Sequence, residues 1–427
     1  MIPNALEALG IPGPAEKTSD PMQPYLTDEH EAHRAEVREF AETEIRPVAR
    51  ELDAQSRFPW DNVRKMADRG WFGVNVPLEL GGLGRDYLSY ILTIEELARI
   101  DASHSITISA HSTLGMSPIL SFGTPEQKER YVPLLAGGKV LGGFGLTEPG
   151  AGSDSAGTRT TAVRENGHYV LNGSKIFITH AGVGEIFVVT ALTDRDAGAK
   201  GITSFIVTKE TTDRDEAERV GVGHAPELEP FMDGVRAAKK EDKMGWRASD
   251  TRELVLEDVR VPADHRLGQE GQGFINFMKT LDSGRIGIGA LALGLAQGAY
   301  DTALAFSDQR KQFGKPIRHF QGIQFRLADM ATRIQAARHL VYHAAWLKQN
   351  GRPYTKEASM AKLYASDIAM DITTEGVQLL GGIGYTSDYP VERHMRDAKV
   401  CQIGEGTNEI QRLVIARQIF DEAFGGR

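Results

Sequence analysis

Residues 273–309 read GFINFMKTLDSGRIGIGALALGLAQGAYDTALAFSDQ, and no proline interrupts this run of small and apolar residues at helical spacing. Two further helical runs follow at about 320–349 and 356–380, and a last run begins near Asn408. Gly314 and Pro316 end the first of these helices. Several long helices in close succession predict a helical bundle for the C-terminal part of the chain.

The region before this bundle has a different pattern. From Leu141 to about Pro262, turns separate the short β-rich runs HYVLNG, KIFITHA, EIFVVTALT, GITSFIVTK and ELVLEDVRVP. Asn172–Gly173 predicts a two-residue hairpin turn. The lack of β–α–β alternation argues against a parallel dinucleotide-binding sheet. Upstream, residues 28–53 and the stretches IEELARI and PEQKERYVPLL have helical spacing.

This order of patterns predicts an α+β fold that is mainly helical. We expect an irregular N-terminal arm at 1–27, an N-terminal helical domain at 28–140, a middle β domain at 141–265 and a C-terminal helical bundle at 266–427. A charged segment at about 209–239 is predicted to form a surface loop or an extended hairpin within the middle domain.

Composition limits the kinds of partner. The net charge is −9 and no basic stretch is dense, which argues against a nucleic-acid partner. Cys401 is the only cysteine, so an internal disulfide and a multi-cysteine metal site are excluded, and no metal site is predicted. No apolar run approaches the length of a membrane span. The first residues do not resemble a signal or transit peptide, so we expect a cytoplasmic protein of bacterial or archaeal type.

Two glycine-rich or β-rich motifs could bind a ligand. In FGLTEPGAGSDSAG (144–157), glycines would let backbone approach a ligand, although an ordinary loop has the same composition. The motif is neither a P-loop nor a Rossmann fingerprint. KIFITHAG (175–182) alternates isoleucines with Phe177 and Thr179. This pattern is typical of a half-buried strand, or of an aromatic ring and a hydroxyl that face a planar ligand.

Three later motifs also carry alternatives. QRKQFGKPIRHFQ (309–321) places Arg310 and Lys311 in the last turn of a helix, where they could cap the helix or bind a pyrophosphate. VQLLGGIGY (377–385) ends a helix on three glycines and leaves backbone open. CQIGEGTNEIQR (401–412) places Glu405 between two glycines, as a solvated loop residue or as a base that a substrate must approach closely.

Taken together and in this order, the motifs resemble the acyl-CoA dehydrogenase family. The resemblance extends from about Leu26 to Phe420, and its matching stretches are FGLTEPGAGSD, NGSKIFIT, KEDKMGWRASDT, LDSGRIG, RKQFGKPI, VQLLGGIGY, ERHMRDAK and IGEGTNEIQRLVIAR. It implies an N-terminal helical domain, a middle β-barrel-like domain and a C-terminal four-helix bundle. It also implies bound FAD without a Rossmann fold, and a homotetramer.

The resemblance implies a reaction as well. Members of the family remove a proton from the α-carbon and a hydride from the β-carbon of an acyl-CoA thioester, which gives a trans-2-enoyl-CoA. Electrons then pass to an electron-transfer flavoprotein. This chemistry serves β-oxidation and the related catabolism of amino acids and aromatic acids.

The resemblance assigns site residues in three groups. The first would line the flavin, with the last two closing the site: Phe144, Leu146, Thr147, Gly152, Ser153, Phe177, Thr179, Thr407 and Glu409. The second would contact the FAD of a neighbouring subunit: Arg310, Phe313, Gln321, Gln378, Gly381 and Gly382. The third would contact substrate: Ser153, Asp282, Arg285, Gly404 and Gly406. Many relatives have tryptophan at the position of Phe177, and relatives often have glutamine at that of Glu409.

Glu405 matches the catalytic base of the family. A minority of members place the base at the position of Gly284, which has no side chain here. The dipole of the following helix should lower the pKa of Glu405, whereas burial should raise it. We expect burial to dominate once a substrate dries the pocket.

The acyl group is less well determined. Many straight-chain members have tyrosine where Gly404 stands, so its absence predicts a branched, cyclic or otherwise bulky acyl group. HSITISAHSTLG (104–115) matches the floor of the acyl pocket; its polar residues could cap helices, face solvent or bind a polar acyl tail. Most relatives cross 209–239 with a shorter connection, so this segment could decorate the surface, cover the CoA adenine or alter docking of the electron acceptor.

Three other functions share most of these motifs. An acyl-CoA oxidase would pass electrons to oxygen, but its members are usually longer at the C-terminus. A nitroalkane oxidase would have aspartate at the position of Glu405. A catalytically idle FAD-binding assembly factor would have a replaced base.

Overall fold

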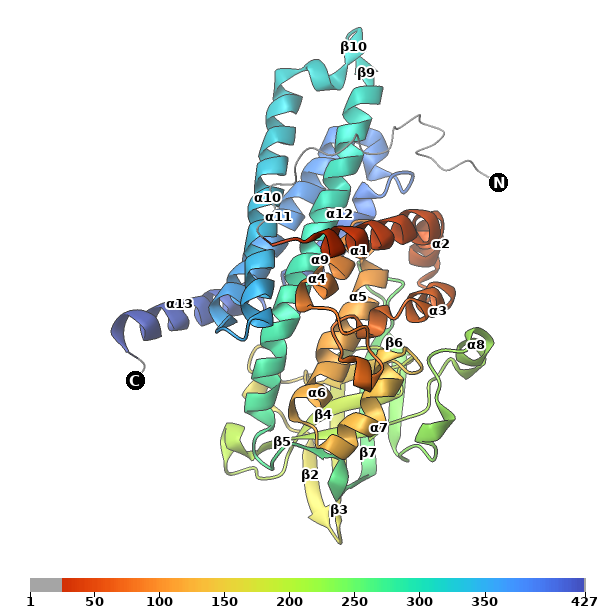
Figure 1. The fold of residues 1–427 in the computed structure, drawn as a ribbon, viewed down its shortest axis with the longest axis vertical. Helices are drawn as coiled ribbons and strands as arrows, with labels where there is room; N and C mark the ends of the chain where they lie inside the picture. The colour runs from red at the N-terminus through yellow and green to blue at the C-terminus, as the bar shows by residue number, and fades with distance from the viewer. Residues whose placement is uncertain (1–24, 426–427) are drawn as a thin grey trace.

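The computed structural model describes residues 25–425, so the predicted arm at 1–27 lies almost entirely outside the described residues. Figure 1 shows long helices along the upper part of the molecule, a sheet in the lower part and the N-terminal helices packed against both. The predicted mainly helical α+β fold is therefore confirmed. None of the helices within 25–425 combines the length and the apolar character needed to cross a bilayer.

The N-terminal helices begin at polar caps. The side chains of Thr27, Asp86, Asp101 and Thr124 each accept a hydrogen bond from a backbone N–H in the first turn that follows. The helices are α1 (Asp28–Phe40), α2 (Arg46–Gln55), α3 (Trp60–Asp68), α4 (Tyr87–Ala98), α5 (Ala102–Ala110), α6 (Ser117–Phe122) and α7 (Pro125–Ala136). Two π-helical segments join them, η1 (Ala41–Ile45) and η4 (His111–Met116).

Helix α5 and segment η4 contain the HSITISAHSTLG stretch. Its polar residues do not face solvent: His104, His111, Ser112 and Thr113 are all buried. His111 is held between the carbonyl of Leu135 and the backbone N–H of Gly142, at 3.0 Å from each. These groups satisfy each other inside the protein, as buried polar groups must.

The middle region forms one eight-stranded sheet. Its order is β6-β7-β3-β2-β4-β5-β8, and β1 pairs with β4 in parallel. The strands are β1 (Gly142–Gly145), β2 (Thr161–Glu165), β3 (His168–Thr179), β4 (Ile186–Leu192), β5 (Ile202–Thr208), β6 (Val235–Lys240), β7 (Thr251–Pro262) and β8 (Arg266–Leu267).

The hairpin predicted at Asn172–Gly173 is wrong. Both residues lie within β3, and the β2–β3 turn is formed by a second Asn-Gly pair, Asn166–Gly167, whose φ angles are 43° and 87°. Gly173 instead lies where the β3–β7 register shifts, and a Cβ there would be 2.8 Å from Cα of Thr160. The glycine therefore serves close packing between strands.

The segment 209–239 is more ordered than the predicted surface loop. It contains helix α8 (Arg214–Val220), which packs against α3, and it leads into β6. The buried carboxylate of Glu185 accepts from Nδ1 of His224 at 2.6 Å and from the N–H of Ala225 at 3.0 Å. This segment therefore connects the N-terminal helices to the sheet.

The C-terminal part is a helical bundle. The helix predicted at 273–309 coincides with α9 (Gly273–Gln309), which packs against α10 (Gln321–Gln349), α11 (Thr355–Leu380) and α12 (Val391–Cys401). Arg310 and Lys311 were predicted to lie in the last turn of α9, but both lie beyond the end of this helix. Arg310 follows the helix in extended conformation, and Lys311 begins the small hairpin of β9 (Lys311–Gln312) and β10 (Lys315–Pro316). The last helix is α13 (Asn408–Phe424).

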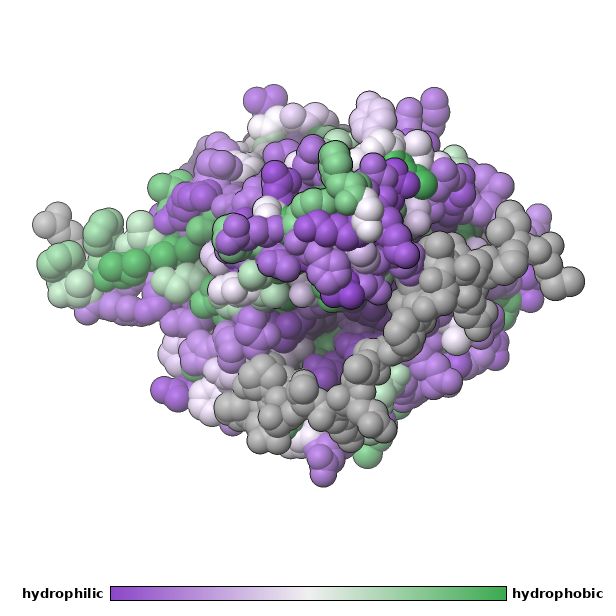
Figure 2. All heavy atoms as spheres, turned by 90° about the horizontal axis from the view of Figure 1, so that it is seen from above, coloured by the Kyte–Doolittle hydropathy of each residue, from purple (hydrophilic) through white to green (hydrophobic). Residues whose placement is uncertain are grey.

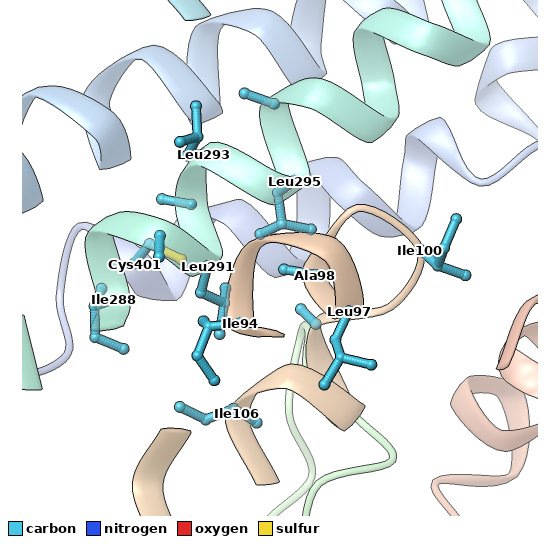
Figure 3. Packing of buried hydrophobic residues seen from close by; sticks show 14 of the residues in the cluster. Ile94, Leu97, Ala98, Ile100, Ile106, Ile288, Leu291, Leu293, Leu295 and Cys401 are labelled. Atoms are coloured by element: carbon cyan, nitrogen blue, oxygen red, sulfur yellow. The ribbon is translucent and has the colours of Figure 1, made fainter. Parts of the chain in front are cut away.

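A single apolar core joins the bundle to the N-terminal helices. Figure 3 shows Ile94 and Ala98 of α4 beside Leu291 and Leu295 of α9. Cys401, the last residue of α12, is fully buried in this cluster. Because Cys401 is fixed in the core, the turn that follows it starts from a rigid position.

Candidate active site

The turn between α12 and α13 carries Glu405. Glu405 and Gly406 both have positive φ, 54° and 90°, so the chain reverses within two residues. The N–H of Gly404 donates to the carbonyl of Val400 at 2.8 Å, which closes α12. Thr407 then caps α13, because its hydroxyl accepts from the N–H of Ile410 at 3.4 Å. A non-glycine residue at positive φ is strained, and such strain is common at functional sites.

Two side chains, Gln411 of α13 and Lys362 of α11, donate hydrogen bonds to this turn. The amide of Gln411 donates to the carbonyls of Glu405 at 3.3 Å and of Gly406 at 2.9 Å. The buried Lys362 of α11 donates to the carbonyl of Gly406 at 2.9 Å and to Oδ1 of Asn408 at 2.8 Å. Hydrogen bonds from side chains of α11 and α13 therefore fix the backbone of the turn that carries Glu405.

The side chain of Glu405 points toward α9. Both of its carboxylate oxygens are buried, and neither has a hydrogen-bond partner. A Cβ built on Gly284 would lie 2.7 Å from Cδ of Glu405 and 3.1 Å from Oε1, and nearer still to Oε2. Glycine at 284 therefore leaves the space that the carboxylate occupies.

Burial determines the protonation of this carboxylate. It raises the pKa of Glu405 to about 7, while the positive charges of Arg285 and Lys362 act in the opposite direction. This direction agrees with the effect of burial expected from the sequence, whereas further drying of the carboxylate by a bound substrate stays a prediction. Side chains of the protein itself dry the carboxylate.

Two tyrosines of α4 wall the same face of α9. The hydroxyl of Tyr87 donates to the carbonyl of Ser283 at 2.9 Å, and that of Tyr90 donates to Ser109 at 3.3 Å. Both rings are buried, and the negative charge of Glu405 is among the causes that raise the pKa of each hydroxyl. Glu405 therefore lies near two buried tyrosine rings.

Asp282 and Arg285 form an ion pair beside the base. Arg285 is buried and donates to Oδ1 of Asp282 at 2.6 Å, while Thr355 donates to Oδ2 at 2.7 Å. Burial raises the pKa of Asp282 and lowers that of Arg285. The positive charge of Arg285 lowers the pKa of Glu405, so the two side chains interact electrostatically. The contact of Asp282 and Arg285 with CoA stays a prediction.

Apart from Thr407 and Glu409, the first group of predicted flavin residues lies on β1, on β3 and on the loop that follows β1. The N–H of Ile176 donates to the carbonyl of Thr147 at 2.8 Å, which places the 146–153 loop beside the Phe177 strand. Phe177 has φ of 59°, lies at a register shift between β3 and β7, and is 63 % exposed. The irregularity turns its ring away from the core. Phe144 is buried, and Gly152 and Ser153 are exposed.

A buried ion pair that the sequence motifs did not reveal supports this loop. Lys175 donates to Glu148 at 2.7 Å, and Glu148 also accepts from Thr158 and from the N–H of Arg159 at 2.6 Å. Burial lowers the pKa of Lys175 to about 8, whereas Lys175 and the hydrogen bonds lower that of Glu148 to about 2. The sequence signal that could have revealed this ion pair is Lys175, a charged residue in the otherwise apolar stretch KIFI.

The second predicted group lies far from the first within one chain. Phe313 is at the tip of the β9–β10 hairpin, with φ of 51° and 93 % of its surface exposed. Arg310 and Gln321 flank this hairpin, and Figure 1 places it at the opposite end of the molecule from the sheet. Gln378 ends α11 near Gly381 and Gly382 of η10 (Gly381–Tyr385). The structure therefore does not bring the two groups together in one chain.

These surfaces are suited to a large planar cofactor. A Cβ at Gly152, Gly381 or Gly382 would meet nothing within 4 Å, so the backbone is open at both places. The rings of Phe177 and Phe313 are both exposed. Thr407 and Glu409 stand at the start of α13, next to the base, and Glu409 is exposed. The residues present therefore fit FAD.

Three family models match the chain in order. They are the N-terminal, middle and C-terminal domains of acyl-CoA dehydrogenase, at residues 27–139, 143–259 and 271–420. The short-chain specific acyl-CoA dehydrogenase of Clostridium acetobutylicum is 50 % identical over 395 residues, which cover 92 % of this chain and 99 % of the relative.

Solved structures agree with these matches. Butyryl-CoA dehydrogenase from Megasphaera elsdenii superposes with a TM-score of 0.86 at 46 % identity, over 92 % of this chain and 99 % of the other. A chain in a structure described as the electron transferring flavoprotein of Acidaminococcus fermentans has a TM-score of 0.86 at 47 % identity, over 92 % and 98 %. This chain therefore belongs to the acyl-CoA dehydrogenase family of FAD-dependent oxidoreductases, which confirms the enzyme class and the cofactor predicted from its sequence.

Proposed function

We propose that the protein dehydrogenates short acyl-CoA thioesters at Cα–Cβ to trans-2-enoyl-CoA, with Glu405 taking the α-proton. The observation that carries this proposal is the buried carboxylate of Glu405, which has no hydrogen-bond partner and a pKa of about 7. A general base is most effective when its pKa lies near the working pH. A carboxylate without donors is also free to accept a proton from carbon.

The residues around Glu405 have distinct tasks in this proposal. A thioester α-proton is weakly acidic, so its removal requires stabilisation of the developing enolate oxygen. Backbone N–H groups at Glu405 and Gly406 would donate to that oxygen, because glycine at 406 permits close approach. FAD, when bound, supplies the acceptor for the β-hydride. The rings of Tyr87 and Tyr90 exclude water from the base.

The acyl pocket is proposed to be short but wide. Tyr87 and Tyr90 wall the α9 face next to the base, which limits depth. A Cβ at Gly404 would meet only the carbonyl of Val400, at 3.4 Å, so space is free on that side for a branch near Cα. The names of the relatives from C. acetobutylicum and M. elsdenii support a short acyl group. A branched acyl group remains the prediction from Gly404.

The FAD site is proposed to be shared between subunits of a homotetramer. The β9–β10 hairpin that carries Phe313 lies at the opposite end of the molecule from the sheet that contains Phe177, which supports contacts to each FAD from two subunits. Helix α13 projects from the body of the molecule, and Figure 2 shows apolar side chains along it. Its exposed apolar residues are Leu413, Ile419, Phe420 and Phe424. Such a surface is typical of an oligomer interface.

Electrons are proposed to pass to an electron-transfer flavoprotein. The similarity to the A. fermentans chain supports this acceptor. Oxygen consumption measured beside flavoprotein reduction would distinguish a dehydrogenase from an oxidase.

Bleaching of the flavin absorbance tests the proposal directly. Purified holoenzyme would be mixed anaerobically with butyryl-, isobutyryl-, 2-methylbutyryl- and octanoyl-CoA. We expect rapid bleaching with the four- and five-carbon acyl groups and slow bleaching with octanoyl-CoA. Glu405→Gln should keep FAD and lose bleaching with all four. Normal bleaching by this variant would refute the base, and a preference for octanoyl-CoA would refute the short pocket.

A further inference from the structure

Lys362 has an unusual position for a lysine. It lies in the middle of α11 between the buried residues Ala358 and Ala365, and its side chain has no exposed surface. Its ammonium donates to the carbonyl of Gly406 at 2.9 Å and to Oδ1 of Asn408 at 2.8 Å. Both acceptors belong to the turn that carries Glu405. A fully buried ammonium is costly, so it requires these partners.

The charge of Lys362 has no carboxylate of its own. Within residues 25–425, no carboxylate oxygen lies within ion-pair distance of its ammonium, whereas Arg285 is paired with Asp282 at 2.6 Å. Glu405 in turn accepts no hydrogen bond. Glu405 and Lys362 therefore carry opposite charges at the turn between α12 and α13: Glu405 belongs to this turn, and Lys362 binds it from α11.

We propose that Lys362 is a positioning residue for the base: it fixes the Glu405 turn through Gly406 and Asn408, and its charge stabilises the ionised carboxylate that accepts the α-proton. This inference rests on the proposed function, in which Glu405 is the base.

The other titratable and charged groups around the pair lie on α4, α9, α11 and α12. Arg285 of α9 stays paired with Asp282, and burial raises the pKa of the Cys401 thiol of α12 to about 12. The hydroxyls of Tyr87 and Tyr90 on α4 have their pKa raised by burial, so both stay neutral. Asp367 of α11 accepts from Asn408 at 2.7 Å, from Gln402 at 2.8 Å and from Arg412 at 3.1 Å.

The pair itself titrates around neutrality. Burial lowers the pKa of Lys362 to about 8 and raises that of Glu405 to about 7. Loss of the lysine charge removes an opposite charge from the vicinity of Glu405, which raises its pKa. The acid limb of the rate profile, where the base becomes ionised, then moves to higher pH.

The experiment is the pH profile of kcat for Lys362→Met holoenzyme with butyryl-CoA. We expect the acid limb to move up by roughly one pH unit. If the pKa rises by this amount, the ionised fraction at neutral pH falls about fivefold, and kcat falls with it and recovers at alkaline pH. Lys362→Gln, which loses the charge but keeps a donor, should show the same shift. Lys362→Arg should restore the wild-type limb.

Ser366→Ala is the matched control. The Ser366 hydroxyl shares a hydrogen bond with the side-chain amide of the same Asn408 at 2.9 Å but carries no charge. Its loss should leave the acid limb at the wild-type position. A limb that shifts equally in Ser366→Ala would overturn the electrostatic role of Lys362.

A second readout needs no turnover. Infrared difference titration of the carboxyl C=O stretch, assigned by its absence in Glu405→Gln, reports the protonation of Glu405 directly. In Lys362→Met this band should persist to higher pH than in wild type. An unchanged titration in Lys362→Met and Lys362→Gln would refute the inference. If Glu405→Gln stays active while the band still shifts, the assigned base is wrong and the electrostatic coupling stands.

Discussion

The carboxylate of Glu405 occupies the space into which a side chain at Gly284 would project. Cδ of Glu405 would lie 2.7 Å from a Cβ at Gly284, closer than unbonded carbon atoms approach each other. Gly284 thus leaves room for the Glu405 carboxylate and has no side chain that could itself act as a base. This relationship connects α9 to the turn between α12 and α13, 121 positions further along the chain by residue number (405 − 284).

Gly284→Ala should displace the Glu405 carboxylate while the fold and FAD binding remain. A displacement of about 1 Å can reduce a rate by about 100-fold, so we expect kcat to fall by that order. Stopped-flow flavin reduction by butyryl-CoA measures the effect.

Gly289→Ala in the same helix is the matched control for Gly284→Ala. Its Cβ would meet Cγ2 of Val341 at 3.3 Å, which a small shift accommodates. We expect near-normal reduction for this variant. Equal rates for Gly284→Ala and wild type would contradict the position of the base.

Glu405→Gln should stabilise the protein at alkaline pH. Burial raises the pKa of Glu405 from 4.5 to about 7 in the folded state, so the folded protein holds this proton more tightly than the unfolded chain. The contribution of this group to the free energy of unfolding is therefore fully present below pH 4.5. It is lost as the pH rises to about 7, and the loss is about 3 kcal/mol. Glutamine stays neutral at every pH. Urea unfolding of the FAD-bound enzyme measures this effect. Between about pH 5 and about pH 8, the free energy of unfolding of Glu405→Gln should rise relative to that of wild type.

The contrary result for Glu405→Gln is clear. If the free energies of unfolding of variant and wild type change in parallel with pH, the carboxylate is hydrated in the folded protein.

Tyr90→Ala should lengthen the acyl chain that the enzyme accepts. The ring of Tyr90 is buried, and its hydroxyl would be 3.1 Å from a Cβ at Gly287, one helical turn beyond Gly284. Removal of the ring opens space along this face, at a cost of about 3–5 kcal/mol in stability. We expect the ratio of kcat/KM for octanoyl-CoA to that for butyryl-CoA to rise at least tenfold.

Tyr90→Phe keeps the ring volume and serves as the control for Tyr90→Ala. It should leave the chain-length ratio unchanged. A raised ratio in both variants would mean that the hydroxyl, rather than the ring, limits the pocket.

Charges on the apolar face of α13 should dissociate the proposed homotetramer. Leu413 is 64 % exposed and Phe420 is 59 % exposed, so aspartate at these positions can be accommodated in the monomer. We expect Leu413→Asp/Phe420→Asp to reduce the mass measured by light scattering, and to reduce the FAD content since the site would be shared. Arg417→Ala, an exposed change on the same helix, should do neither. A tetramer that survives both aspartates would place the interface elsewhere.

Much of the architecture follows from local periodicity. The helix predicted at 273–309 matches α9 because apolar spacing and the absence of proline act within a few turns. Two Asn-Gly pairs near the start of the sheet show where prediction from local sequence fails. Asn166–Gly167 forms the hairpin, while Asn172–Gly173 lies inside β3, where pairing with β7 and contact with Thr160 decide the conformation. Identical dipeptides thus adopted different structures for tertiary reasons.

The sequence by itself determined the order of helices and strands, the family, and Glu405 as the candidate base, because these depend on spacing and on motifs along the chain. Tertiary structure decided the properties of that base. Burial raises its pKa, Gly284 makes its space, and Lys362 reaches its turn from another helix. Desolvation and Coulomb interactions depend on distances between segments that are remote in sequence, and only the folded chain sets those distances.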